Sequence, residues 1–459
     1  MRKIVTDPEK IKEVLKKGVE NIYPSPEALE KLLKSGKRIR LYCGFDPTSP
    51  NLHIGNAIQL RKLAQFQKLG HEVIFLIGDF TGMIGDPSDK TAARKKLNRK
   101  ETLENLKNYK KQASKILDFS GKNPAKVLYN GKWNNKLKFG DLIELASNFT
   151  VQQMIVRDMF EKRFYGEWQC NKCKKVFITP HERIFFSSNK DFEDGSMVSK
   201  TDKLTCPFCN FNGVTIFSLP KPIYLHEFLY PLAQAYDSVA MDVDLEIGGN
   251  DQTFNMLCGR DLMKILKNKE KFVLATKLLA DPSGKKMGKT EGNMINLDEK
   301  PDQMYGKIMS WPDELIIPGL ELCTDFSLDE VGKISKTLKQ GQVNPRDEKA
   351  KLAKEVVSIC YDKKTAEEAE KEFNRVFRER KIPTSIPEVK CAEGTRLTSS
   401  VLVECGLASS RTAADGLIKQ GALDVEIDGV VIENYKEKEI TLKKGTILRL
   451  GKRRIIRTI

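Results

Sequence analysis

The stretch RIRLYCGFDPTSPNLHIGNAIQLRKLAQFQKL, residues 38–69, decides the fold class of this chain. Ile39, Leu41 and Cys43 alternate with polar or amphipathic residues, which predicts a short strand. A turn with glycine and proline follows, and Asn51 is placed to cap a helix with apolar residues on one side. A strand that leads directly into a helix is typical of an α/β domain.

The junction between this strand and this helix contains Thr48, His53, Gly55 and Asn56. Free backbone N–H groups and the positive end of the helix dipole favour an anion such as phosphate at such a position. A glycine there would let a ligand approach closely. An ordinary strand–helix turn, in which the histidine only caps or packs, is the alternative.

A basic loop lies much further along the chain, where residues 285–290 read KKMGKT. Basic runs usually form a solvated loop. Together with His53-Ile54-Gly55-Asn56, however, this loop resembles the pair of nucleotide motifs of class I aminoacyl-tRNA synthetases, usually written H-I-G-H and K-M-S-K-S. Here the second motif reads Lys286-Met287-Gly288-Lys289-Thr290. Both motifs in this order make the resemblance specific.

The chain has 459 residues, enough for several domains, and its 78 Lys and Arg against 62 Asp and Glu give a net charge of +16. This surplus suits a polyanionic partner such as RNA, although a basic protein without such a partner can have the same composition. No uninterrupted apolar stretch approaches the roughly 20 residues that span a bilayer, and residues 1–10 lack the apolar core of a signal peptide. We therefore expect a cytoplasmic protein with no membrane association.

Four of the ten cysteines form two C-x-x-C pairs. Four thiolates around one ion make a closed tetrahedral shell, which is typical of structural zinc. We predict a zinc ribbon over residues 166–219 that needs its metal to fold; reduced, unoccupied thiols are the alternative, and His181 is a less favoured substitute ligand. The other cysteines lie in apolar or mixed settings, which indicates reduced thiols rather than disulfides. The predicted ligands are Cys170, Cys173, Cys206 and Cys209.

The sequence around the opening stretch extends the α/β pattern. Residues 8–36 are predicted to form one or two helices outside the nucleotide domain, and residues 72–77 a buried strand before a glycine-rich turn. Strand–helix–strand units form parallel sheets, whose ligands bind at the carboxyl ends of the strands. This arrangement places Tyr42, Thr81 and Asp86 beside the strand–helix junction.

Helices are predicted over residues 101–120 and residues 139–163, with a short strand leading to Asn130 between them. The apolar face of the second helix could pack in the core or form a dimer contact, and the sequence does not separate the two. Lys90 and Arg94 precede these helices on a basic segment that could fold over phosphate or begin an exposed helix.

A polar set interrupts the apolar helix predicted after residue 223. Tyr230, Gln234 and Asp237 occur at positions i, i+4 and i+7, so one helical face carries a phenol, an amide and a carboxylate. Buried polar groups need partners, which can be internal or a small polar ligand. A short strand then ends in the turn Gly248-Gly249-Asn250-Asp251-Gln252, which resembles a ribose-binding element.

The chain after Asn296 is predicted to be helical to about Arg380, where a linker with prolines follows. Residues 392–459 predict two short helices followed by strands, with no acidic residue after Glu439. This basic segment could be a solvated end of the chain. It also resembles the small RNA-binding module of ribosomal and RNA-modifying proteins, for which phosphate contact is the expected role.

Taken in order, these motifs resemble the bacterial tyrosyl-tRNA synthetase family over nearly the whole chain, residues 166–219 excepted. The matching stretches are LYCGFDPT, HIGN, GDFTGMIGDPS, FLYPLAQAYDS, IGGNDQ and KMGKT. The resemblance implies an α/β fold with a Rossmann-like parallel-sheet catalytic domain, a zinc-ribbon insertion, a helical anticodon-binding domain and a small α+β C-terminal RNA-binding module. The implied boundaries are N-terminal helices 1–36, catalytic domain 37–165 and 220–298, ribbon 166–219, helical domain 299–386 and RNA-binding module 392–459.

The resemblance also implies a tyrosine pocket. Tyr42 and Asp237 would hold the substrate phenol, and leaving both unpaired with phenylalanine would lose roughly 1–3 kcal/mol per group. Asp86, Tyr230 and Gln234 would hold the substrate ammonium group. The implied tyrosine-binding residues are Tyr42, Thr81, Asp86, Asn130, Tyr230, Gln234, Asp237 and Gln252.

The implied reaction has two steps. The ionised carboxylate of L-tyrosine attacks the α-phosphate of ATP, with Mg²⁺, and expels diphosphate; the terminal ribose of tRNA(Tyr) then attacks the adenylate. The protein must supply alignment and positive charge. The implied catalytic residues are Thr48, His53, Asn56, Lys90, Arg94, Lys286, Lys289 and Thr290, and the implied ATP-binding residues are Asp46, Gly55, Gly249 and Asp251.

Asn56 departs from the second histidine of the commonest motif, but its amide N–H can still donate to a ribose oxygen, so we expect activity to persist. The cysteine segment is expected to contact the tRNA acceptor end or to buttress a homodimer. A tryptophanyl enzyme of the same architecture is disfavoured because Tyr42 and Asp237 suit a phenol. A catalytically idle RNA-binding paralogue is disfavoured by the intact lysines and by His53, Asp86 and Asp237.

Overall fold

The structure is a computed structural model, and it describes residues 3–86, 97–155, 158–165, 167–178, 205–212, 214–218, 223–280, 294–377, 386–451 and 454–459. The chain divides into two compact units, Met1–Glu370 and Lys371–Ile459. Within the described ranges, every helix is too short or too polar to cross a membrane.

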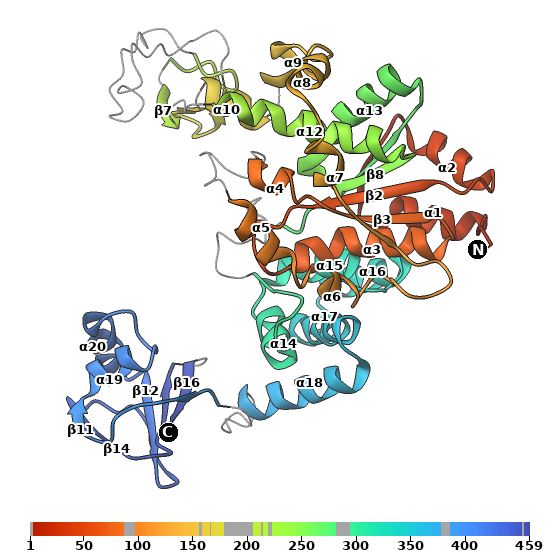
Figure 1. Cartoon of the computed structure of the whole chain (residues 1–459). Helices are drawn as coiled ribbons and strands as arrows, with labels where there is room; N and C mark the ends of the chain where they lie inside the picture. The colour runs from red at the N-terminus through yellow and green to blue at the C-terminus, as the bar shows by residue number, and fades with distance from the viewer. Residues whose placement is uncertain are drawn as a thin grey trace. The chain divides into compact units, whose positions relative to one another are not determined.

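The first unit is built on a six-stranded sheet with the strand order β1-β9-β8-β2-β3-β4. Figure 1 shows β8, β2 and β3 of this sheet, with helices around them. Five strands run parallel and β1 is antiparallel at one edge. The central strands are buried nearly throughout, as expected for a parallel sheet covered by helices on both faces. The strands are β1 Val19–Tyr23, β2 Arg40–Phe45, β3 Glu72–Ile77, β4 Lys126–Tyr129, β8 Leu245–Gly249 and β9 Phe272–Thr276.

The N-terminal region differs from its helical prediction. It contains α1 Pro8–Lys16 and α2 Pro26–Lys34, but β1 lies between them and pairs with β9. The N-terminal residues therefore extend the sheet instead of packing outside it. Two consecutive residues of β1 are exposed, so buried and exposed residues do not alternate regularly along it. This alternation is the signal by which a half-buried strand is predicted from a sequence.

Helix α3 Ile54–Lys68 connects β2 to β3 as the sequence predicts. The helix predicted over residues 139–163 is instead divided into three short helices. The other helices that surround the sheet are α4 Thr81–Ile84, α5 Arg99–Leu106, α6 Tyr109–Ala113, α7 Gly131–Asn134, α8 Phe139–Ala146, α9 Val151–Ile155, α10 Asp158–Tyr165, α12 Leu225–Met241 and α13 Thr253–Lys267.

A helical region follows the sheet within the first unit, as predicted after residue 296. Its largest buried residues include Tyr305 and Trp311, which pack among apolar side chains of neighbouring helices. The helices are α14 Pro301–Met309, α15 Ile316–Cys323, α16 Leu328–Lys339, α17 Pro345–Cys360 and α18 Lys363–Phe377, the last of which crosses into the second unit.

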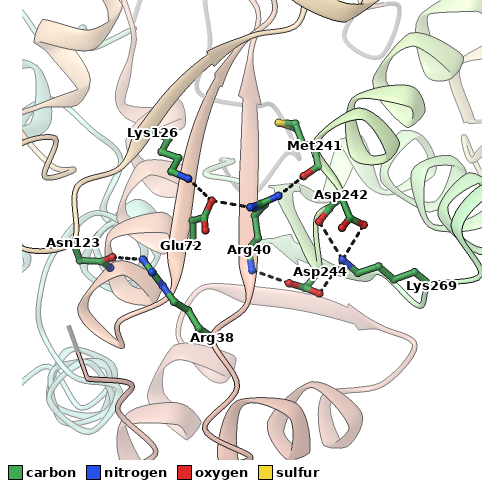
Figure 2. Close-up of polar contacts among 9 residues, drawn as sticks. All are labelled: Arg38, Arg40, Glu72, Asn123, Lys126, Met241, Asp242, Asp244 and Lys269. Atoms are coloured by element: carbon green, nitrogen blue, oxygen red, sulfur yellow. Dashed lines mark hydrogen bonds and ion pairs between the residues drawn. The ribbon is translucent and has the colours of Figure 1, made fainter. Parts of the chain in front are cut away.

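Charged side chains pair with one another at the amino ends of the parallel strands (Figure 2). Glu72 Oε1 accepts from Arg40 Nε at 3.0 Å and from Lys126 Nζ at 2.8 Å, which joins β2, β3 and β4. Asp244 Oδ2 accepts from the backbone N–H of Arg40 at 2.8 Å, and Lys269 lies 3.1 Å from Asp244 Oδ1. We call this set the amino-end network; it consists of Arg38, Arg40, Glu72, Asn123, Lys126, Asp242, Asp244 and Lys269.

The cysteine segment forms a small three-stranded sheet, ordered β6-β5-β7. A bidentate ion pair between Arg163 and Glu227, at 2.5 and 2.9 Å and buried on both sides, joins α10 to α12 where the chain enters and leaves this segment. The strands are β5 Glu167–Cys170, β6 Val176–Phe177 and β7 Val214–Ser218.

The second unit has the two short helices and the later strands that the sequence predicts, but two further short strands precede the helices. One sheet is ordered β10-β16-β15-β12-β13, and β11 pairs with β14 in a second sheet. Leu402, Leu423 and Leu448 are fully buried in its core. Its elements are β10 Glu388–Val389, β11 Gly394–Leu397, α19 Thr398–Glu404, α20 Arg411–Lys419, β12 Leu423–Ile427, β13 Val430–Ile432, β14 Glu439–Leu442, β15 Ile447–Leu450 and β16 Arg454–Thr458.

Candidate functional site

Polar side chains converge beyond the carboxyl ends of the parallel strands. Asp46 follows β2, and its two carboxylate oxygens accept from Thr81 Oγ1 at 2.6 Å and from Tyr230 OH at 2.8 Å. One carboxylate thus connects the turn after β3 to α12. Gly78 leaves room for this contact, because a Cβ there would lie 1.9 Å from Asp46 Oδ1.

Asp237 is 2 % exposed on α12 and accepts three hydrogen bonds from N–H groups of neutral side chains. Trp133 Nε1 donates at 2.7 Å, and the Nδ2 atoms of Asn130 and Asn134 donate at 3.1 Å. Burial raises the pKa of Asp237 to about 8, and these three donors oppose the rise. A buried carboxyl group without a basic residue among these donors is suited to recognise a hydroxyl group of a ligand.

Tyr42 is fully buried on β2, and its hydroxyl group shares a 2.9 Å hydrogen bond with Ser238 Oγ, the residue next to Asp237. Burial raises the pKa of Tyr42 well above 10, with the nearby carboxylates of Glu246 and Asp237 adding to the rise. Tyr42 therefore stays a neutral phenol that can only donate and accept hydrogen bonds.

Three amide side chains form a second cluster. Asn255 Nδ2 donates to Gln234 Oε1 and to Gln252 Oε1, both at 3.0 Å. Gln252 Nε2 donates to Asp86 Oδ2 at 2.6 Å, and Gln234 Nε2 donates to Glu246 Oε1 at 3.0 Å. The predicted residues of the tyrosine pocket are therefore brought together on α12, on the turn after β8 and on the segment after β3.

Sequence reasoning missed the residues behind this cluster. Glu246 is 1 % exposed inside β8 and forms an ion pair with Lys271, which is fully buried and directly precedes β9. The available signal for Glu246 was a charged residue between the apolar Leu245 and Ile247, whereas Lys271 ends the charged run Lys269-Glu270-Lys271 and offered no such signal. The missed residues are Trp133, Asn134, Ser238, Glu246, Asn255 and Lys271.

The strand–helix junction differs from its prediction. His53, not Asn51, is the N-cap of α3: His53 N donates to Asn56 Oδ1 at 3.0 Å, and Gly55 N donates to His53 Nδ1 at 3.1 Å. Ile54 N donates to Ile295 O at 2.9 Å. The prediction that the first-turn N–H groups are free is therefore wrong, because the histidine ring and residue 295 already occupy them.

The glycine of this junction also serves another purpose than close approach of a ligand. A Cβ at Gly55 would lie 2.9 Å from the His53 ring, so glycine allows that ring to fold back as a cap. Gly249, the last residue of β8, lies close to Asp251, because a Cβ there would be 2.4 Å from Asp251 Oδ1. Thr48 N donates to Asp46 O at 2.8 Å, which tightens the turn after β2.

Several predicted residues lie outside the described residues, and their placement stays a prediction. They are Lys90, Arg94, His181, Lys286, Lys289 and Thr290.

The four cysteines of the two C-x-x-C pairs come together as predicted, with all four sulfur atoms within 4.8 Å of one another. Cys170 Sγ lies 3.6 Å from Cys209 Sγ, and Cys173 Sγ lies 3.6 Å from Cys206 Sγ. Backbone N–H groups of Lys172, Cys173 and Phe208 point at the sulfur atoms at 3.4 Å. Four sulfur atoms at these distances could hold a metal ion.

Comparison with known proteins is consistent with this geometry. The family model for class I tRNA synthetases (W and Y) matches residues 34–171 and 210–378. The tyrosine–tRNA ligase of Carboxydothermus hydrogenoformans is 38% identical over 458 residues, covering 97% of each chain. That of Thermotoga maritima is 37% identical over 453 residues, covering 98% of this chain and 97% of the relative.

Solved structures share the fold at lower identity. The tyrosyl-tRNA synthetase of Archaeoglobus fulgidus, complexed with L-tyrosine, has a TM-score of 0.55 at 18% identity and covers 79% of this chain and 100% of its own. A C-terminally truncated mitochondrial tyrosyl-tRNA synthetase of Aspergillus nidulans has a TM-score of 0.57 at 19% identity, over 80% of this chain and 94% of its own.

Proposed function

This chain belongs to the family of class I tRNA synthetases for tryptophan and tyrosine, and from this premise we propose how its residues ligate tyrosine to tRNA. The activity is that of a tyrosine–tRNA ligase, as in the full-length relatives. The observation that supports tyrosine over tryptophan is Asp237, a buried carboxyl group next to Ser238, whose hydroxyl contacts the Tyr42 phenol. An indole offers no hydroxyl group to this arrangement.

The tyrosine pocket follows from the two clusters. Tyr42 and Asp237 recognise the phenol of the substrate. The ammonium group of the substrate donates hydrogen bonds to Asp86, Tyr230 and Gln234. Asn130 and Thr81 connect the two ends, since Asn130 Nδ2 donates both to Thr81 Oγ1 at 2.9 Å and to Asp237 Oδ2. Gln252 completes the pocket through its hydrogen bond to Asp86.

The chemistry requires alignment rather than acid–base catalysis. The tyrosine carboxylate attacks the α-phosphate of ATP, and diphosphate leaves as its charge is neutralised by Mg²⁺ and by cationic side chains. Thr48 in the turn after β2, and His53 and Asn56 at the start of α3, serve this purpose, and Asp46, Gly55, Gly249 and Asp251 bind the adenosine. Asn56 Oδ1 is used in the cap, which leaves its Nδ2 group to donate to the ribose. The residues proposed to close over the diphosphate are Lys90, Arg94, Lys286, Lys289 and Thr290, of which the first four supply positive charge.

The four cysteines fit a structural zinc ion. Zn–S bonds of about 2.3 Å in a tetrahedron separate the sulfur atoms by about 3.8 Å, close to the two 3.6 Å distances observed. Cys170, Cys173, Cys206 and Cys209 would hold the ion as thiolates, and the ion would stabilise residues 166–219, which otherwise have a small core around Trp168. Metal analysis of wild-type protein and of Cys209→Ser tests this: about one zinc per chain in the former and a clear loss in the latter are expected.

The remaining assignments concern the partners. We propose that the helical domain 299–386 binds the anticodon arm, that the basic module 392–459 contacts tRNA phosphates, and that the protein works in the cytoplasm. A homodimer contact is proposed on α8, α9 and the start of α12, where Phe139, Val151 and Leu225 are 78%, 66% and 82% exposed. Sedimentation of wild-type protein and Leu225→Asp tests the dimer, which the variant should weaken.

The complete reaction is tested by charging tRNA(Tyr) with labelled tyrosine. The expected result is ATP-dependent formation of tyrosyl-tRNA, with no product from tryptophan. Failure to charge, from protein that still forms the adenylate, would contradict the proposed tRNA contacts but not the amino-acid site.

A further inference from the structure

The amide cluster of the candidate site has a defined hydrogen-bond direction. Glu246 and Asp86 are carboxylates, which only accept, so Gln234 and Gln252 each turn their Nε2 group toward a carboxylate. Their Oε1 atoms then face Asn255 Nδ2, which donates to both. Asn255 therefore helps to fix the orientation of both glutamine amides, with each Nε2 directed toward a carboxylate and each Oε1 directed toward Asn255.

Asn255 has no alternative orientation in this cluster. Its side chain is fully buried on α13, and exchanging its oxygen and nitrogen would place Oδ1 against two glutamine oxygens. Among the described residues, Asn255 Oδ1 has no hydrogen-bond partner. The residue is thus held by its two donated bonds, and losing them would release both glutamine oxygens.

A buried ion pair anchors one end of the cluster. Lys271 Nζ contacts Glu246 Oε2 and donates to Met256 O at 3.1 Å, so the lysine holds the Glu246 side chain in place. Gly259 of α13 leaves room for this pair, because a Cβ there would lie 2.5 Å from Lys271 Nζ and 2.9 Å from Ser238 Oγ. The orientation of Gln234 is therefore set by charge and by Asn255 together.

We propose that Asn255 is a positioning residue of the tyrosine site, which makes the site selective for an ammonium group by holding the oxygen atoms of Gln234 and Gln252 available to it. This inference deepens the proposed function and rests on it. An amide oxygen has two lone pairs, so each glutamine can accept from Asn255 and from the substrate ammonium at once. A reversed glutamine would present an N–H₂ group to the ammonium, which repels it.

The test uses Asn255→Asp in the full-length protein, because aspartate has the same shape and cannot donate. Equilibrium binding is measured for L-tyrosine and for 3-(4-hydroxyphenyl)propanoate, which has the phenol and carboxylate but no ammonium group. The Kd for tyrosine should rise about tenfold or more, as expected for a lost hydrogen bond to a charged group, while the Kd for the analogue changes less than about twofold.

Asn123→Asp is the matched control. Asn123 is also buried, and its Nδ2 atom also donates two hydrogen bonds, to Gln67 O at 3.2 Å and to His71 O at 2.8 Å, but it lies in the amino-end network. We expect this variant to lower thermal stability without changing the ratio of the two Kd values. Asn255→Ser, which keeps one donor, replaces Asn255→Asp if the latter does not fold, and the same selective loss is expected.

Equal weakening of both ligands, or no change for tyrosine, would overturn the inference and assign Asn255 a structural role only. Wild-type protein that does not bind tyrosine at all would instead overturn the proposed function, and this inference with it. The two failures are distinguished because only the second affects the wild-type protein.

Discussion

Polar side chains gather at both ends of the six-stranded sheet, but their hydrogen-bond and ion-pair partners differ between the two ends. At the amino ends, Glu72 is paired with Arg40 and Lys126, whose side chains are 41% and 57% exposed (Figure 2). At the carboxyl ends, Asp237 is buried and receives hydrogen bonds from neutral donors. The amino-end charges satisfy one another, whereas Asp237 keeps a buried carboxyl group that can form a hydrogen bond with a ligand.

This difference separates stability from function within one sheet. Partly exposed ion pairs contribute little each and are redundant. A buried carboxyl group that is held by neutral donors gains little stability from its charge, and sites with such perturbed groups are candidates for function. Substitutions at the carboxyl ends should therefore change activity, and those at the amino ends should change stability.

The largest expected effect comes from the same substitution at the two ends. Asp237→Asn should lower kcat/KM for tyrosine between about tenfold and a hundredfold, because the phenol loses a buried carboxyl group as its hydrogen-bond partner. Asp244→Asn should leave kcat/KM within about twofold and lower the free energy of unfolding by about 1 kcal/mol or less. ATP–diphosphate exchange measures kcat/KM of both variants, and urea unfolding measures their free energy of unfolding. Equal losses of kcat/KM in Asp237→Asn and Asp244→Asn would contradict the difference proposed between the two ends of the sheet.

Two glycines that flank β3 give the next effect. A Cβ at Gly78 would lie 1.9 Å from Asp46 Oδ1 and 2.3 Å from Thr81 Oγ1, whereas one at Gly70, which has φ +96°, would lie 2.8 Å from Lys3 O. Both alanine variants should lose about 1–3 kcal/mol of stability. Only Gly78→Ala should also lose exchange activity per folded molecule, by several-fold. Retained activity in Gly78→Ala would show that Asp46 is not needed.

The pH dependence of stability should have opposite signs at the two ends. The pKa of Asp237 is raised to about 8, so the folded state holds a proton that the unfolded state releases above about pH 4. Stability from this group is full at low pH and falls by about 1.4 kcal/mol per pH unit as the pH rises toward 8. The pKa of Glu72 is lowered: burial opposes this, but Lys126 and Arg40 outweigh it. The stability that Glu72 contributes is therefore lost as the pH falls through its lowered pKa.

Urea unfolding between pH 5 and 8 checks these signs. Asp237→Asn should reduce the decline of stability with rising pH, and Glu72→Gln should leave the decline unchanged. An unaltered slope in Asp237→Asn would mean that this carboxyl group is ionised across the range.

Glu72→Gln gives the smallest expected effect. It removes the charge that Arg40 and Lys126 share, yet both cations are well exposed, so the loss of stability should be about 1 kcal/mol or less. Exchange activity should not change. A loss of activity would show that the amino-end network is coupled to the site.

The sequence predicts the elements whose residues repeat regularly. The structure confirms three such predictions: the unit of β2, α3 and β3, the polar face of α12, and the gathering of the four cysteines in one cluster. They could be predicted because period and spacing are local properties of a sequence. β1 was missed, since an edge strand with irregular burial has no such period.

The residues behind the site are harder to predict. Asn255 and Lys271 contact residues of other elements, and nothing within their own segments shows which partners the fold brings to them. The same reason explains the wrong prediction at the start of α3, where Ile295, far away in the sequence, occupies the N–H group of Ile54.

The most direct test of the account is ATP–diphosphate exchange by the purified full-length chain with Mg²⁺, using tyrosine, phenylalanine and tryptophan in parallel. The account predicts exchange with tyrosine alone, because Asp237 and Tyr42 form a site for a phenol. Exchange with tryptophan, or none with any of the three from folded protein supplied with zinc, would contradict it.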